Sequence, residues 1–249
     1  MRLSVRGLCC PTSRPRERQA KDTGHSGPRA DDHAPVDAPL QAMIPRTHVS
    51  DDIPVAHSVS DAERLADAVD QNMKQWVQIN AASILVPLFE RLKTEKGLDV
   101  EALVAYFERW GRALEQDIEF LRLGFKHYIA ADFTSALHIL VPRFEALLRA
   151  AFEAGGTAAF RSRRTQAGSE AETLGSFLSK PAVKNATPED LHAYIRIVLA
   201  EQRGWNLRNR VAHGLITLQE CTVLQCTVII HLLLLLTTIP IPALETTEG

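Results

Sequence analysis

The chain has 249 residues, 45% of them hydrophobic, and a formal net charge of −2. This length and apolar content are sufficient for one sizeable buried core. The near-neutral charge argues against a protein that holds nucleic acid through a large basic field. The cysteines lack the paired spacing of a zinc site, and no histidines follow the HExxH pattern, so we expect no metal and no cofactor.

The N-terminal residues 1–59 differ in composition from the rest of the chain. Seven of the 13 prolines lie here, with few large apolar residues and no helical or strand period. Such a segment cannot offset its ordering entropy, which predicts a disordered Pro/Arg-rich tail. The basic stretch Arg2–Arg29 indicates a solvated tail more than a nucleic-acid contact or a targeting peptide. Because Pro11 and several charges interrupt any apolar run after the initial Met, we expect a cytoplasmic protein.

From Ser60 onward the apolar period is helical, which predicts an all-α fold. Ser60 is typical of an N-cap, and the run that follows should end at Lys96-Gly97. A second helix is expected from about Asp99 to Leu123. Its apolar stripe consists of Leu103, Phe107, Trp110, Leu114, Ile118 and Leu121.

The third predicted helix, from about Phe133 to Ala154, has a polar side as well as an apolar one. Its apolar positions are Phe133, Leu137, Leu140, Phe144, Leu147, Leu148 and Phe152. On another side, spacings of four, three and four align His138, Pro142, Glu145 and Arg149. Glu145 and Arg149 form an ordinary i,i+4 ion pair or contribute to a site, and the sequence leaves both readings open.

The C-terminal third contains a surface loop and, besides the short helix of the motif described below, two further helices. Residues 161–171 are polar and basic, and Thr187-Pro188 should begin a helix that reaches about Gln202. The last helix should start at the capping box Thr217–Glu220 and continue to about Leu236. Its apolar run approaches the length of a membrane span, but Gln225 and His231 interrupt it. A central bundle helix is therefore expected, with buried thiols at Cys221 and Cys226, and membrane insertion is not.

The run Arg208-Asn209-Arg210-Val211-Ala212-His213-Gly214 is where chemistry can be read from the sequence. A permanent cation suits phosphate oxygens, and an imidazole exchanges protons near neutral pH. Asn206 should cap a short helix and Gly214 should close it in the left-handed conformation. Arg208 and His213 are separated by about 140° on an ideal helix. They meet only if the helix end unwinds or if a second copy completes the site.

This RNxxAHG run resembles the signature of a domain family of unknown function that is similar to the HEPN superfamily and to the endoplasmic reticulum membrane-associated RNA degradation proteins. The resemblance covers roughly residues 124–236. It implies a HEPN-like helical bundle over 124–240, with residues 60–123 as additional N-terminal helices. Many HEPN proteins are metal-independent endoribonucleases of defence or toxin–antitoxin systems with a composite cleft between two protomers. A homodimer, RNA or a nucleotide, and an antitoxin-like protein are the partners that it implies.

The resemblance also implies roles for individual residues. His213 would transfer protons during attack of the ribose 2′-hydroxyl, and Arg208 would stabilise the charge on the phosphorane. Asn209 would orient the turn or the imidazole, and Glu145 would be a polar partner from a facing helix. Arg149 and Arg210 are the expected RNA contacts. The alternative is a non-catalytic module of the same fold that binds a nucleotide, RNA or a protein, with the motif hydrogen-bonded inward.

Overall fold

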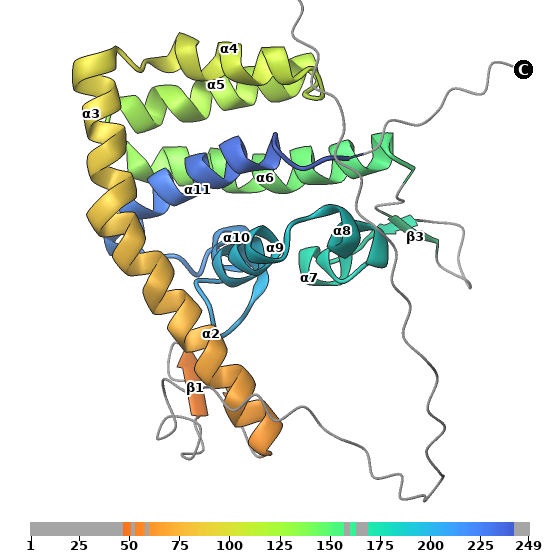
Figure 1. Cartoon of the computed structure of the whole chain (residues 1–249). Helices are drawn as coiled ribbons and strands as arrows, with labels where there is room; N and C mark the ends of the chain where they lie inside the picture. The colour runs from red at the N-terminus through yellow and green to blue at the C-terminus, as the bar shows by residue number, and fades with distance from the viewer. Residues whose placement is uncertain (1–46, 51–52, 58–59, 157–159, 163–168, 242–249) are drawn as a thin grey trace, which may run out of the picture. The chain divides into compact units, whose positions relative to one another are not determined.

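The computed structural model describes residues 47–50, 53–57, 60–156, 160–162 and 169–241 (Figure 1). The prediction of an all-α fold is confirmed, because helices form the buried core of these residues. Two small hairpins, β1 with β2 and β3 with β4, are the strands of the described part. The helices are α2 (Asp61–Asn80), the π turn η1 (Ala81–Leu85), α3 (Val86–Lys96), α4 (Val100–Trp110), α5 (Glu115–Ile129), α6 (Phe133–Ala154), α7 (Leu174–Leu178), α8 (Pro181–Ala186), α9 (Glu189–Ile195), the π turn η2 (Arg196–Ala200), α10 (Leu207–Ala212), the 3-10 turn η3 (Leu218–Glu220) and α11 (Val223–Leu236).

The elements α2, η1 and α3 follow one another as one long helical rod (Figure 1). Its start is a capping box, in which Ser60 Oγ accepts from the Glu63 amide at 3.2 Å and Glu63 Oε2 accepts from the Ser60 amide at 2.9 Å. Its end is Gly97, which takes a left-handed conformation with φ of 66°. Both predicted ends are therefore confirmed, and each satisfies backbone groups that the helix leaves unpaired.

The predicted helix from about Asp99 to Leu123 is wrong in its continuity. Gly111 adopts φ of 69° and separates α4 from α5, and α5 extends to Ile129. Leu103, Phe107, Ile118 and Leu121 are buried as expected, whereas Trp110 is half-buried. Leu114 is 58% exposed, because it lies at the N-cap of α5 and outside the apolar face of either helix.

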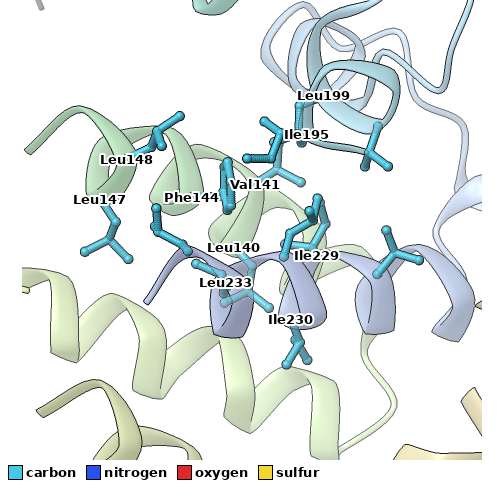
Figure 2. Close-up of a cluster of buried hydrophobic side chains, with 14 of the residues drawn as sticks. Leu140, Val141, Phe144, Leu147, Leu148, Ile195, Leu199, Ile229, Ile230 and Leu233 are labelled. Carbon is cyan, nitrogen blue, oxygen red and sulfur yellow. The ribbon is translucent and has the colours of Figure 1, made fainter. Parts of the chain in front are cut away.

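The core lies between α6 and α11, with α5 and η2 packed around them. Figure 2 shows Leu140 and Phe144 of α6 beside Ile229 and Leu233 of α11. The bounds of α6 agree with the prediction. Gly124 on α5 allows close approach to α6, since a Cβ there would lie 2.4 Å from Leu140 Cδ2. The buried, reduced state of Cys221 and Cys226 is confirmed.

The segment from α7 to α11 departs from the predicted boundaries in three places. The helix after Pro188 continues through η2 and stops at Ala200, not at Gln202. Thr187 is the C-cap of α8 and does not cap the next helix. The capping box at Thr217 caps η3, and α11 starts only at Val223. The short helices α7 and α8 were not predicted.

The hairpins lie where loops or a tail were expected. Strands β1 (Thr47–Ser50) and β2 (Ile53–His57) pair within the predicted tail 1–59, so the absence of regular structure does not hold there. The rest of that tail, including Arg2–Arg29, lies outside the described residues. Strands β3 (Phe160–Ser162) and β4 (Ser169–Ala171) bound the predicted loop 161–171. In the described part, no helix combines the length and apolar content needed to cross a membrane.

Candidate functional site

The motif lies on α10, a short helix fixed to the core by the buried side chains Leu207 and Val211. Asn206 precedes it with φ of 50° and makes no side-chain bond to the helix amides, so the predicted N-cap role of this side chain is wrong. Its Oδ1 instead accepts from Asn209 Nδ2 at 2.8 Å. Gly214 has φ of 67°, as predicted, and lets the chain turn away after His213.

Arg208 points from α10 to α6, where it meets Glu145. Its Nε donates to Glu145 Oε2 at 2.5 Å, and Nη2 lies 3.5 Å from Oε1. Its Nη1 donates to Asn209 Oδ1 at 3.1 Å. The side chain of Arg208 is 28% exposed and that of Glu145 is 13% exposed. A planar guanidinium held at three nitrogens has one fixed orientation, so Glu145 and Asn209 position it.

Glu145 holds a second guanidinium one turn along α6. Arg149 donates to Glu145 Oε1 from Nε at 3.0 Å and from Nη2 at 2.6 Å. Arg149 also donates to the carbonyl of Glu172, 2.5 Å away, and its guanidinium lies 4.9 Å from the centroid of the Phe177 ring. Glu145 thus forms the i,i+4 ion pair with Arg149 and also contacts Arg208 of the motif, and its role in a site stays a prediction. Two arginines around one carboxylate leave a local charge of about +1.

His213 lies apart from that cluster at the C-cap of α10. It is exposed, and its imidazole has no hydrogen-bond or ion-pair partner among the described residues. Arg208 turns toward Glu145 and not around the helix end toward His213. The structure therefore brings Arg208, Asn209 and Glu145 together and leaves His213 separate within one chain.

Arg210 faces a different neighbour from Arg208. Its Nη2 donates to Glu220 Oε2 at 2.7 Å and to the carbonyl of Leu215 at 3.2 Å. The bond from Arg210, with further bonds from Thr217, lowers the pKa of Glu220 to about 2. Of the two predicted RNA contacts, Arg149 belongs to the Glu145 cluster and Arg210 does not.

Among the residues that the structure describes, His138 on the polar face of α6, His192 and His231 form no further cluster. His138 is exposed and shares a hydrogen bond of 2.8 Å with the Thr134 carbonyl through Nδ1. His192 bonds the Leu178 carbonyl, and His231 lies 3.3 Å from the hydroxyl of Tyr194. In the ranges that the structure describes, no three His, Cys, Asp or Glu side chains lie together as a metal site.

Two members of the cluster were missed at the sequence level. Glu172 and Phe177 reach Arg149 because α7 packs beside η2, near α6. The signal available was weak: Thr173 caps a helix of only five residues. Comparison of the chain with protein-family models, with curated proteins and with solved structures gave no match.

Proposed function

We propose that the protein is a metal-independent endoribonuclease of HEPN type that cleaves RNA by attack of the 2′-hydroxyl on the adjacent phosphate. The bond between phosphorus and the 5′-oxygen breaks, and the product carries a 2′,3′-cyclic phosphate. His213 exchanges the protons, and Arg208 stabilises the negative charge on the phosphorane. The observation that carries the proposal is an exposed imidazole with no partner among the described residues, close in sequence to an arginine held in one orientation by Glu145 and Asn209.

The bonding of Arg208 leaves capacity for a phosphate. A guanidinium has five N–H donors, and the bonds to Glu145 and Asn209 occupy three of them. The side chain is partly exposed, so the remaining donors can reach an oxyanion. Arg149, which shares Glu145, gives the cluster the positive charge that attracts RNA.

A second copy of the chain completes the site in this proposal. Within one chain, Arg208 faces α6 and His213 lies at the opposite end of α10. A twofold pairing of protomers about this helix end brings the two motifs together, so that one cleft holds both imidazoles. The protein is accordingly proposed to act as a homodimer.

The test is cleavage of end-labelled single-stranded RNA in EDTA. We expect the wild type to give cyclic-phosphate ends and His213→Ala to lose activity by at least about 100-fold, because a general acid–base group contributes that much. His127→Gln is the matched control, since it removes an imidazole outside the motif that pairs with Asp132, the N-cap residue of α6. Circular dichroism of all three proteins establishes that each is folded.

The bonding of Arg208 also favours a second function. All three of its nitrogens donate within the protein, as expected for a motif that serves structure. Absence of cleavage by the wild type across several RNAs, with all proteins folded, contradicts the enzyme. It indicates instead the non-catalytic binding module.

A further inference from the structure

A pocket lies on the side of α10 away from Glu145. It has a volume of about 390 Å³ and is bounded by α2, by α10 and by the segment that leads into α11. Arg208 and Arg210 are about 200° apart on the helix, so the two arginines serve opposite faces. The residues that line the pocket are Lys74, Gln78, Gly204, Trp205, Leu207, Arg210, Glu220, Thr222, Leu224 and Gln225.

Lys74 is the unusual residue of this pocket. Its side chain is half-buried, and its ammonium has no hydrogen-bond or ion-pair partner among the described residues. Other partly buried lysines are paired: Lys93 lies 2.6 Å from Glu90, and Lys180 lies 2.8 Å from Glu172. Removing a cation from water without a counter-charge costs free energy, and an anion bound beside Lys74 would offset that cost.

The neighbouring charges do not supply that anion. Burial lowers the pKa of Lys74, and the positive charge of Arg210 lowers it further. Glu220 also lines the pocket, but it pairs with Arg210: its Oε2 accepts from Arg210 at 2.7 Å and from the amide and hydroxyl of Thr217 at 2.9 and 2.8 Å. Arg210 and Glu220 cancel each other, which leaves the pocket with a net charge of about +1.

The remaining walls suit a small polar ligand with an anionic end. Gln78 and Gln225 carry amide groups, and Gln225 uses its Oε1 for the hydroxyl of Thr222, which leaves its Nε2 as a donor. Trp205, Leu207 and Leu224 provide an apolar wall. The volume lies at the lower end of the range for small-molecule sites.

We propose that this pocket binds a small phosphate monoester, with the phosphate between Lys74 and Arg210 and the rest of the molecule against Gln78, Gln225 and the apolar wall. Arginine and lysine are the side chains that pair with phosphate oxygens. The site uses neither Arg208 nor His213 nor Glu145. The proposal therefore stands apart from ribonuclease activity and can succeed where that activity fails.

Isothermal titration calorimetry of the full chain, in buffer without phosphate or sulfate, tests the site. Inorganic phosphate and AMP should each bind once per chain, and adenosine, which lacks the phosphate, should not. Lys74→Gln should weaken both by about tenfold or more, since it removes a charged hydrogen-bond donor. Lys74→Arg should retain binding. Lys184→Gln, which changes an exposed lysine of α8, is the matched control and should bind as the wild type does.

Thermal unfolding gives a second readout that a merely structural lysine would not produce. Without ligand, Lys74→Gln should unfold about 2–4 °C higher than the wild type, because it removes an unpaired charge beside Arg210. Phosphate should raise the unfolding temperature of the wild type and not that of the variant. The proposal is overturned if neither phosphate nor AMP binds at millimolar concentration. It is equally overturned if Lys74→Gln binds phosphate and AMP as tightly as the wild type does. Binding of RNA that is weakened by Lys74→Gln, with no binding of phosphate or AMP, also overturns it.

Discussion

The two faces of α10 differ in how their positively charged side chains are paired. On the face toward α6, Glu145 accepts hydrogen bonds from Arg149 and Arg208, and each arginine has a further acceptor. On the face toward α2, Glu220 pairs with Arg210, while Lys74 has no partner among the described residues. The first arrangement links α10, α6 and α7. The second leaves the ammonium of Lys74 without a counter-charge among the described residues.

The two faces show two uses of a cationic side chain: in an ion pair it stabilises the fold, and without a counter-charge it can bind an anionic ligand. A satisfied ion-pair cluster between helices resists disruption, because loss of one member leaves buried charges unpaired. An unpaired cation lowers stability until a ligand arrives. Changes on the Glu145 face should therefore cost stability, and changes at Lys74 should cost ligand affinity.

The largest loss of stability should come from a change at Gly204. This residue lies just before α10, so its position affects both faces of that helix. A Cβ at Gly204 would lie 2.0 Å from the carbonyl oxygen of Ile197, which is backbone and cannot rotate away. Gly204→Ala should lower the free energy of unfolding by about 4 kcal/mol. Urea unfolding measures it. Gly175→Ala, where a Cβ meets nothing within 4 Å, is the control and should change the free energy of unfolding little. If both variants lose the same free energy of unfolding, the contact with Ile197 is not the cause of the loss.

A smaller loss is expected when the carboxylate of the Glu145 face is neutralised. Glu145→Gln leaves Arg149 and Arg208 without their shared anion and should lower the free energy of unfolding by about 2–3 kcal/mol. Glu95→Gln breaks a pair whose partners are 73% and 52% exposed and should cost less than about 0.5 kcal/mol. Denaturant titration of both variants tests the contrast, which fails if the two losses are alike.

Replacing the fork of Arg208 by a point charge should cost less again. In Arg208→Lys the ammonium can reach Glu145 or Asn209 but not both in the present geometry. We expect a loss of about 1 kcal/mol in the free energy of unfolding, with the charge kept. Arg91→Lys, on the exposed side of α3, serves as the control. A loss no greater than that of the control would mean that the bidentate geometry is not needed.

The smallest effect concerns the pH dependence of the Lys74 face. The pKa of Glu220 falls to about 2 in the fold, from 4.5. A lowered carboxyl pKa adds stability above about pH 4.5, and this stability is lost as the pH falls toward 2. Because the Glu220 side chain is 36% exposed, solvent screens the pair, and the contribution should be about 0.5 kcal/mol. Glu220→Gln should reduce the slope of stability against pH in that window. An unchanged slope would contradict the pairing.

Helix positions were predictable where a long apolar period and a specific cap coincide. The bounds of α6, the cap at Ser60 and the stop at Gly97 came from such local signals. The break at Gly111 was missed because apolar residues continue at helical spacing across it. The π turns η1 and η2 depend on i→i+5 bonding, which side-chain spacing alone does not reveal.

The sequence named several members of the candidate site, but it missed Glu172 and Phe177 and did not give the pairings. Arg208 and Glu145 were both named from sequence, but they are 63 residues apart, and their contact follows from how α10 packs on α6. Lys74 carries no local signal, because its isolation results from three separate segments meeting around one pocket. The partition of charge between the two faces of α10 is thus a property of the tertiary structure.

The π turn η1 has a consequence for the length of the rod. Eight residue steps separate the buried Ala81 from the buried Phe89, and in a regular α-helix eight steps would leave them about 80° apart. The turn absorbs one step, since the amide of Val86 reaches back to the carbonyl of Ala81. Seven steps in α geometry differ by only about 20°. The rod therefore contains one surplus residue, and a chain one residue shorter within η1 would keep Phe89 facing the core.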